Sequence, residues 1–399
     1  MSPERAFHAV VGQAAVVEEL RAAVAAARAN LRGEPERGMS HAWLFTGPPG
    51  SGRSVAARAF ATALLCPDGG CTVCPDCRSA SAGTHPDLES VAPEGLSYGV
   101  RDARALVLRA ALAPSAGRWR VTVVEDADRL TEPALNALLK AIEEPPAHGV
   151  FLLCAPSVED VLPTVRSRCR LVTLRVPPPE SIASLLVSRD GVDPALAAFA
   201  AHAAVGHVGR ARRLATDEEA RRRRREVLAV PRQVMSGVGA CFVAAENLVG
   251  AAKDESVALT SAAAAAESAE LEQALGGAVV GEGSSGGRRP RGSAAAFREL
   301  EERQRSRLTR AQRDALDRAL GDLASYYRDV LAVQLGGGQS PVPLANADLS
   351  GAIGEDADRG SPEASLRRWE AVLRCRDAIA ANVAPLLAVE AMTLELSAG

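Results

Sequence analysis

The feature that most constrains the fold is a glycine-rich loop between an apolar run and an alanine-rich run. Residues 42–45 are apolar or aromatic and typical of a buried strand, and residues 55–65 are typical of a helix. The loop between them fits the phosphate-binding pattern G-x-x-x-x-G-K-[ST], except that Arg53 replaces the lysine. Strand, loop and helix in this order are the context that the pattern requires, so the sequence predicts a nucleotide-binding α/β domain. The residues expected around the phosphates are Gly47, Pro48, Pro49, Gly50, Ser51, Gly52, Arg53 and Ser54.

Arg53 puts the catalytic competence of this loop in question. The glycines let backbone N–H groups curl around a phosphate, the helix N-terminus adds positive potential, and Ser54 would place its hydroxyl on Mg²⁺. Lysine reaches phosphates as a compact point charge, whereas arginine is a wider planar fork, so the exchange is not conservative. The only lysines in the chain are Lys140 and Lys253, so a coding bias toward arginine also explains it. The sequence leaves binding of ATP and Mg²⁺ open.

Composition favours a cytoplasmic protein of two or three domains. The 399 residues are 47% hydrophobic, which is enough for sizeable cores. The net charge of −3 provides no global basic field that would draw the chain to nucleic acid. We expect no signal peptide, because the N-terminus lacks a charged-then-apolar layout, and no membrane span, because no run approaches about 20 apolar residues.

Residues 1–176 and the rest of the chain have different patterns. The first region alternates strand-like runs with helical patterns, which predicts a parallel sheet with flanking helices. Residues 177–216 read as a small helical unit and residues 217–399 as almost entirely helical, with long helices expected at about 297–335 and 363–395. The expected strands are 43–46, 121–125, 150–155 and 171–174. Segments near 276–296 and 336–362 are rich in Gly, Pro or Ser, so we expect both to be flexible.

An acidic pair ends the expected strand at 121–125. In P-loop ATPases an acid at this place holds Mg²⁺, and in many a following acid activates the attacking water. The usual order is Asp then Glu, whereas this chain has Glu125 then Asp126. A misplacement of about 1 Å can cost on the order of a hundredfold in rate. The pair is therefore either a degenerate catalytic site or a solvated acidic turn.

Four cysteines within twelve residues predict a metal site. Two pairs have the C-x₂-C spacing, and four thiolates at this spacing can close a tetrahedral Zn²⁺ site that is structural, because it has no open position. The alternative is four unligated surface cysteines. The expected ligands are Cys66, Cys71, Cys74 and Cys77, whereas Cys154, Cys169, Cys241 and Cys375 are predicted to be small apolar core residues.

Three further segments have an informative pattern, and two of them allow two interpretations. Leucines and an isoleucine at helical spacing between residues 135 and 142 predict one apolar helix face, which Pro145 and Pro146 follow. Arg168 follows an expected strand and loop, from where it can reach a neighbour's phosphates or form an ordinary surface ion pair. The block Arg221–Arg225 is either a solvated helix face or a patch that faces DNA or a partner.

Together these residues resemble the bacterial clamp-loader ATPases, the gamma/tau and delta-prime subunits of DNA polymerase III, within the AAA+ superfamily. The resemblance runs in order along about residues 8–215, and NALLKAIEEPP followed by SRC is highly specific to the family. It implies an AAA+ P-loop domain at 1–176 with a zinc-binding insert at 66–77, a helical lid at 177–216 and a helical collar at 217–399. The segments that carry it are 11–13, 47–54, 66–77, 85–88, 135–146 and 151–169.

Departures from the family's motor pattern favour a delta-prime-type subunit with little or no ATPase activity of its own. Ser167-Arg168-Cys169 is intact, so the resemblance implies that Arg168 is an arginine finger that acts in trans on ATP held by a neighbour. The four departures are Arg53 for the lysine, Glu125-Asp126 for the acidic pair, Ala155 for a sensor threonine and Arg210 one place late in the lid.

The resemblance also implies partners. These are the gamma/tau and delta subunits in a hetero-pentameric ring within the polymerase III holoenzyme, the sliding clamp, and primed DNA reached through the complex. Two alternatives remain: an ATP-hydrolysing motor subunit like gamma/tau, and a stand-alone DNA-binding module that uses the cysteine site and Arg221–Arg225. The acidic net charge disfavours the module.

Overall fold

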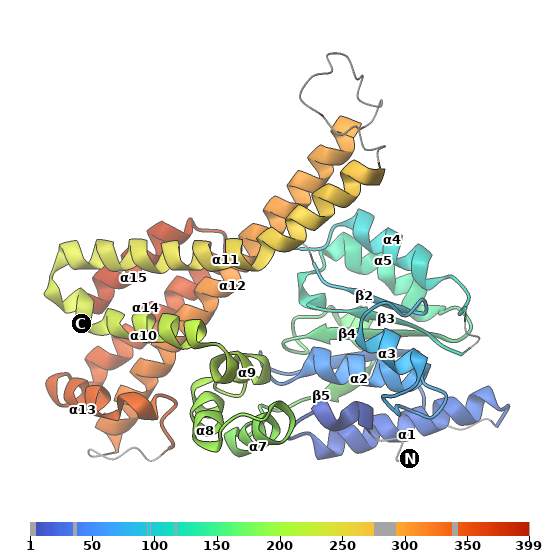
Figure 1. The fold of residues 1–399 in the computed structure, drawn as a ribbon, viewed down its shortest axis with the longest axis horizontal. Helices are drawn as coiled ribbons and strands as arrows, with labels where there is room; N and C mark the ends of the chain where they lie inside the picture. The colour runs from blue at the N-terminus through green and yellow to red at the C-terminus, as the bar shows by residue number, and fades with distance from the viewer. Residues whose placement is uncertain are drawn as a thin grey trace. The chain divides into compact units, whose positions relative to one another are not determined.

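The chain folds into two compact units, Met1–Thr216 and Asp217–Gly399 (Figure 1). The computed structural model describes residues 5–34, 38–93, 95, 97–115, 118–274, 293–336 and 342–398. Within these ranges, no helix combines the length and the apolar character that a membrane crossing requires.

A five-stranded parallel sheet forms the centre of the first unit. Its strands follow the order β2-β3-β4-β1-β5, and every pairing between neighbours is parallel. The predicted α/β fold is therefore confirmed, as are the four expected strands. Strand β2 was missed because its four residues are mostly half-exposed and do not form an apolar run. The bounds are β1 Ala42–Thr46, β2 Leu88–Val91, β3 Arg120–Val124, β4 Gly149–Ala155 and β5 Arg170–Thr173.

Helices cover both faces of this sheet. Strands β1, β3 and β4 are buried throughout, which explains why they read as continuous apolar runs. Along β1 the side chains alternate, so Trp43 belongs to the core beside α1 and α2, whereas Leu44 belongs to the core beside α4 and α5. The helices are α1 Ala14–Leu31, α2 Arg53–Leu65, α4 Val100–Ala110 and α5 Glu132–Glu143. The expected apolar face of α5 is confirmed, with Leu135, Leu138 and Ile142 buried.

Shorter elements complete the first unit. Three helices follow the sheet in the segment expected to be a small helical unit: α7 Pro179–Asp190, α8 Pro194–Ala203 and α9 Val208–Thr216. The remaining elements are η1 Arg5–Ala9, α3 Pro75–Ser81, η2 Ala127–Arg129 and α6 Pro163–Arg166.

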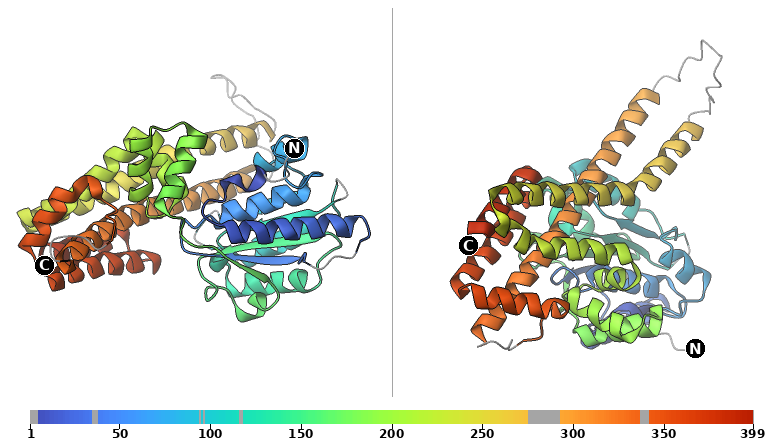
Figure 2. Two further views of the ribbon diagram at one scale, coloured as in Figure 1. Left: turned by 90° about the horizontal axis from the view of Figure 1, so that it is seen from below. Right: turned by 60° about the vertical axis from the view of Figure 1, so that its left-hand side comes forward.

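The described part of the second unit is helical. Its longest helices, α11 Val238–Ala274 and α12 Ser293–Leu335, run side by side and extend beyond the other helices of this unit (Figure 2). The other elements are α10 Glu218–Gln233, η3 Val234–Ser236, η4 Ala347–Leu349, α13 Ser350–Arg359, α14 Pro362–Ala380 and α15 Pro385–Ala398.

Two expectations about this unit need correction. The segment 336–362 was expected to be flexible, but α13 occupies residues 350–359, with Ile353 and Ala357 buried in the helical core. The single helix expected at 363–395 is two helices, because Asn382 adopts a positive φ of 69° and Pro385 starts a new helix. The expectation for 276–296 concerns residues that lie outside the described part, except for residues 293–296, which begin α12.

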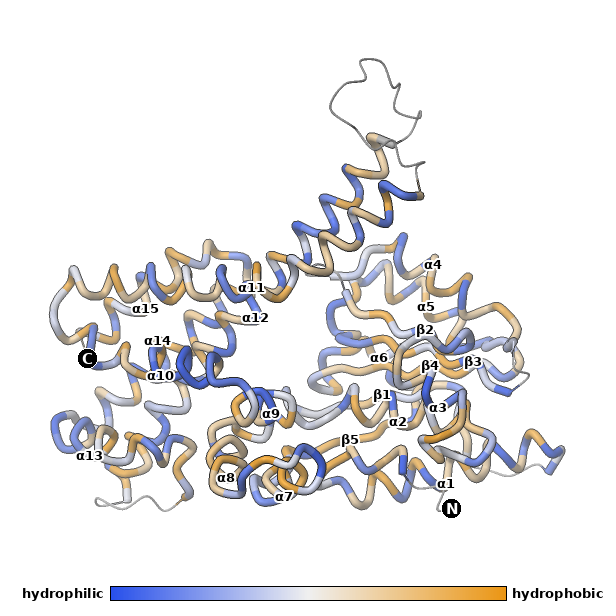
Figure 3. Tube along the Cα trace, viewed as in Figure 1, coloured by the Kyte–Doolittle hydropathy of each residue, from blue (hydrophilic) through white to orange (hydrophobic). Residues whose placement is uncertain are grey.

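The arginine block lies in α10, the strongly hydrophilic helix in Figure 3, and three of its arginines form ion pairs inside the unit. Arg224 is 4% exposed, and it bonds Asn346 at 2.7 Å and contacts Asp322 and Asp348. Arg222 and Arg223 pair with glutamates of α10 and α11. Neither reading of the block is right for Arg224, which is part of the core. A partner-facing patch is disfavoured because intramolecular acids already neutralise much of the block.

Candidate functional site

The glycine-rich loop leaves β1 at Gly47 and enters α2 at Arg53. Gly47, Gly50 and Gly52 have φ values of 152°, 90° and 90°, which L side chains adopt only with strain. Gly52 is the N-cap residue of α2 and provides no side-chain cap, so backbone N–H groups of the first helical turn remain for a ligand. This is the geometry in which helix N-termini bind phosphate. Nucleotide binding by Gly47–Ser54 stays a prediction.

The loop also packs tightly against its surroundings. A Cβ atom on Gly47 would lie 2.5 Å from the carbonyl oxygen of Leu174, and one on Gly50 would lie 2.6 Å from Cα of His207. His207 belongs to the turn between α8 and α9, so the small helical unit closes over the loop. The sequence did not predict this role for His207, because only the fold brings the two residues together.

Gln13 ties the loop to the segment that follows β5. Its side chain is 6% exposed, and its Nε2 donates to the carbonyl oxygens of Ser51 at 3.4 Å and of Arg175 at 2.5 Å. Its Oε1 accepts from the backbone N–H of Arg175 at 3.2 Å. In the sequence only the family resemblance, through residues 11–13, pointed to this glutamine. The structure gives it a positioning role.

Two polar atoms of the loop are enclosed without a hydrogen-bond partner among the described residues: Nη1 of Arg53 and Oγ of Ser51. The Arg53 cation acts on groups at the carboxyl ends of β3 and β4. Burial raises the pKa of the Cys154 thiol to about 12, and the positive charge of Arg53 opposes this rise. An unsatisfied buried donor costs about 1–3 kcal/mol, which a bound anion would remove.

The acids after β3 are arranged differently from a free Mg²⁺ site. The carboxylate of Glu125 accepts a hydrogen bond from Nη2 of Arg58, which lies on α2. Asp126 has a φ of 49° and begins the short helix η2, so its backbone turns away from the strand direction. Burial raises the pKa of Asp128 in the same turn. No spacing in the sequence connects residue 58 with residue 125, so the pair could not be predicted.

Arg168 follows α6, and its guanidinium group is satisfied within the chain. Nε lies 2.6 Å from Oε1 of Glu143 at the end of α5, and Nη1 donates to the carbonyl oxygen of Thr164 at 2.8 Å and to Oγ of Ser167 at 3.1 Å. The side chain is 40% exposed. The surface ion pair considered from the sequence therefore exists, with Glu143 as its partner.

The sheet separates Arg168 from the loop of its own chain. Arg170 begins β5 opposite Trp43 near the start of β1, whereas the loop leaves β1 after Thr46, opposite Thr173. The three steps from Trp43 to Thr46 span about 10 Å of strand, and Arg168 precedes Arg170 by two residues on the far side. Arg168 thus lies at the amino edge of the sheet, and the loop lies at the carboxyl edge.

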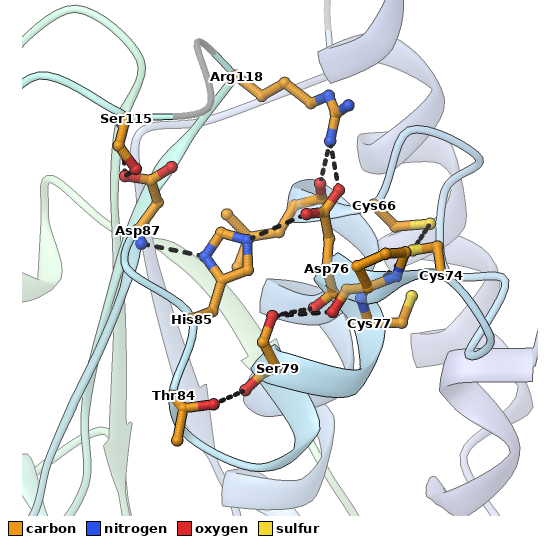
Figure 4. Close-up of polar contacts among 12 residues, drawn as sticks. Cys66, Cys74, Asp76, Cys77, Ser79, Thr84, His85, Asp87, Ser115 and Arg118 are labelled. Atoms are coloured by element: carbon orange, nitrogen blue, oxygen red, sulfur yellow. Dashed lines mark hydrogen bonds and ion pairs between the residues drawn. The ribbon is translucent and has the colours of Figure 1, made fainter.

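The four predicted cysteines come together in one cluster, and Figure 4 shows three of them, Cys66, Cys74 and Cys77. Their Sγ atoms all lie within 4.8 Å of one another, and two Sγ–Sγ distances from Cys66 are 3.7 Å. A tetrahedral site with Zn–S bonds of about 2.3 Å has edges of about 3.8 Å, so the cluster could hold a metal ion of this kind. The backbone N–H groups of Val73 and Cys74 lower the pKa of the Cys71 thiol to about 7, whereas burial raises the pKa of Cys77.

Polar contacts fix helix α3, which contains Cys77 and begins directly after Cys74, onto the sheet domain (Figure 4). Arg118 donates at 2.8 Å both to Asp76 and to the carbonyl oxygen of Leu65, the residue before Cys66. The buried His85 accepts from the backbone N–H of Asp87 at 3.0 Å, and its Nε2 lies 3.7 Å from Asp76. Contacts of this kind around ligands orient them and maintain a metal site. Of the scattered cysteines, Cys154, Cys241 and Cys375 are buried, as predicted, and Cys169 is partly buried.

Comparison with known proteins finds that the sheet domain is similar to subunits of DNA polymerase III. Residues 29–178 match the family model described as DNA polymerase III, delta subunit. Residues of this chain are 38% identical over 185 positions to DNA polymerase III subunit gamma/tau of Mycobacterium tuberculosis, which covers 45% of this chain and 30% of the relative. The delta' subunits of Escherichia coli and Bacillus subtilis are 41% and 32% identical over 38% and 41% of this chain.

The fold is that of an α/β domain with a glycine-rich loop between β1 and α2, and these matches are all to DNA polymerase III subunits. Over residues 29–178 the chain is similar to DNA polymerase III subunits of the delta' and gamma/tau kinds, in agreement with the resemblance seen in the sequence. The chain spans 46% and 50% of the two delta' relatives and 30% of the gamma/tau relative.

Proposed function

We propose that this chain is a delta-prime-type subunit of the DNA polymerase III clamp loader that hydrolyses ATP weakly or not at all. In this role it supplies Arg168 in trans to ATP held by a neighbouring subunit. The observation that carries the proposal is the position of Arg168 at the edge of the sheet opposite to its own loop. Because the residue cannot serve its own loop, a phosphate it stabilises has to belong to another subunit.

The rest of the proposed assembly follows from the family. The helical unit Asp217–Gly399 acts as a collar that joins gamma/tau and delta subunits in a five-membered ring, and α7–α9 act as the lid. The ring opens the sliding clamp and places it on primed DNA. Support for this part is the helical architecture of the second unit and the delta' and gamma/tau names of the relatives.

The decisive experiment compares Arg168→Ala with Arg166→Ala in the reconstituted loader. Both arginines are exposed and lie at neighbouring positions, but only Arg168 belongs to the SRC motif. An arginine finger contributes about 10³–10⁵ in kcat at its site. We expect Arg168→Ala to reduce ATP hydrolysis at the site it serves by about 10³–10⁵, so that the loader loses that site's share of its DNA-stimulated hydrolysis while the other sites keep their own fingers. Equal activity of the two variants would refute the trans role.

A second candidate function is that of an ATP-hydrolysing motor like gamma/tau. Nη1 of Arg53 favours it, because this atom is enclosed without a hydrogen-bond partner in the described part of the chain and is therefore available to a phosphate. The two functions differ in what the purified chain does alone. The motor predicts steady ATP turnover by the isolated chain that Arg53→Ala abolishes, whereas the delta-prime role predicts turnover close to the background of a chain-free sample.

We also propose that the cysteine cluster binds Zn²⁺ as a structural ion. The donor set of four thiolates with N–H groups directed at their sulfur atoms fits zinc. Elemental analysis of the purified chain should give one zinc ion per chain. Cys77→Ser should lose it and lower the melting temperature, whereas Cys375→Ser, which changes a buried cysteine outside the cluster, should keep it.

A further inference from the structure

We propose that the loop 47–54 binds the phosphates of a nucleoside di- or triphosphate without a divalent metal ion. In this mode Arg53 contacts the phosphates, and Arg58 takes the place of the metal ion beside Glu125. The inference rests on the proposed function, because a subunit that does not hydrolyse ATP has no need of Mg²⁺ to activate the phosphoryl group. It adds a property of the chain's own loop that the trans action of Arg168 does not require.

The anion side of this site is complete. The loop has three glycines with positive φ, an uncapped helix N-terminus, and Ser51, which is 2% exposed and whose Oγ has no partner among the described residues. Arg53 adds an enclosed Nη1 that also lacks a partner there. A guanidinium group makes charge-assisted, often bidentate bonds to phosphate, so its fork suits this ligand. Two enclosed donors without partners among the described residues, Oγ of Ser51 and Nη1 of Arg53, indicate a site for an anion.

The metal side of the site is occupied by a cation of the chain. Glu125, the first acid after β3, is 18% exposed and pairs with Arg58 on the helix that the loop starts. A Mg²⁺ ion at this carboxylate would have to displace the guanidinium and stand beside two arginine charges, those of Arg53 and Arg58. Mg²⁺ needs near-ideal octahedral oxygen ligands, which it usually takes from one or two free carboxylates and the substrate phosphates. The residues present therefore fit the phosphates but do not fit the metal ion.

The charges are consistent with a nucleotide that arrives without its metal ion. A metal-free polyphosphate carries more negative charge than the Mg²⁺ complex, and two arginines beside the loop compensate it. Arg53 replaces the lysine of a motor, and Arg58 supplies the second positive charge. In this arrangement the two arginines act as a pair, and removing Arg58 leaves Glu125 free to accept a metal ion.

The test is equilibrium binding of ADP and of ATP to the purified full chain, measured by calorimetry in excess EDTA and in excess Mg²⁺. For the unchanged chain we expect the two dissociation constants to agree within about threefold. Arg53→Ala should weaken binding at least about tenfold in both conditions, the loss of one charge-assisted contact. Arg58→Ala should make binding Mg²⁺-dependent by at least about tenfold, whereas Arg58→Lys should behave as the unchanged chain.

Arg101→Ala, on the exposed side of α4, is the matched control and should change neither constant. Melting temperatures of all variants show whether each one folds. The inference is overturned if the chain binds neither nucleotide in EDTA, or if Mg²⁺ tightens ATP binding by the unchanged chain tenfold or more. Neither result affects the proposed function, which is tested by Arg168→Ala in the complex. If Arg168→Ala leaves ATP hydrolysis by the complex unchanged, the binding measurement still decides whether the loop binds nucleotide without a metal ion.

Discussion

Arg53 at the carboxyl edge of the sheet and Arg168 at its amino edge differ in what surrounds their guanidinium groups. Arg53 has an enclosed Nη1 without a partner among the described residues, in a loop whose motif departs from the motor pattern. Arg168 belongs to an unchanged motif, yet a carboxylate, a carbonyl oxygen and a hydroxyl of its own chain satisfy it. Arg53, which departs from the motor pattern, has a donor available to a ligand. Arg168, which keeps the pattern, already has partners in its own chain.

The difference teaches that sequence agreement and readiness to bind are separate properties. An unsatisfied buried donor gains free energy when an anion arrives, whereas a satisfied one has to exchange partners. Arg168 can therefore act on a neighbour's phosphate only after Glu143 gives way. We expect assembly of the ring to provide that exchange, because a phosphate offers a guanidinium charge-assisted, often bidentate bonds in place of those to the carboxylate.

The largest effect is expected from Gly50→Ala at the carboxyl edge. The new methyl group would meet Cα of His207 at 2.6 Å in a backbone conformation with φ of 90°. Strain and overpacking together should lower the free energy of unfolding by about 2–4 kcal/mol, measured by chemical denaturation.

Gly52→Ala is the control for Gly50→Ala. Gly52 has the same φ, but the described residues leave the space around its Cβ position open for 4 Å, so only the strain of about 1–2 kcal/mol applies. Equal losses in the two variants would show that the lid does not close over the loop. That result would mean that the glycine-rich loop is not enclosed by His207, which is the feature that distinguishes the carboxyl edge of the sheet from the amino edge.

A smaller effect is expected from Glu143→Gln at the amino edge. The change removes the charge that pairs with Arg168, and exposed ion pairs contribute about 0–1 kcal/mol. Because Arg168 no longer has to leave this carboxylate before it acts, ATP hydrolysis by the loader should rise about two- to fivefold. Glu144→Gln, the exposed neighbour, should leave the rate unchanged. A rate decrease in Glu143→Gln would mean that the ion pair positions Arg168 instead of restraining it.

The smallest effect is expected from restoring the motor residues of the loop. A chain with Arg53→Lys, Glu125→Asp and Asp126→Glu should still show no turnover above background when it is isolated. The reason is that Arg168 remains at the opposite edge and Ala155 provides no sensor hydroxyl. Steady turnover by this triple variant, measured by phosphate release, would mean that the carboxyl edge needs nothing from another subunit.

Much of the sheet domain was predictable, because its physics is local in sequence. Strands β1, β3 and β4 are buried on both faces and appear as apolar runs. The spacing of the four cysteines was enough to predict that their thiols form one cluster. Strand β2 has no such run, since three of its four residues are half-exposed. The helical unit was predictable only as helical. The helix α13 was missed because its sequence is rich in Gly and Asp and has only two buried side chains, which do not form a recognisable apolar pattern.

The contacts that define the candidate site were not predictable, because they join distant parts of the chain. Arg58 and Glu125 are 67 residues apart, and Gly50 and His207 are neighbours only in the folded chain. The sequence predicted that Arg168 would be either a finger or an ion pair. The structure shows the ion pair and, through the strand register, the edge at which the arginine lies.

The buried Arg224 of the second unit has a consequence for how that unit folds. Its guanidinium is held by α12 through Asp322 and by the segment 346–348, where Asn346 is itself bonded by Asp329. A fragment that lacked α10, α12 or the segment 346–348 would leave a charge buried without its partners, which costs about 3–5 kcal/mol. The helices of this unit therefore form cooperatively, and no shorter stretch of it is expected to be a stable building block.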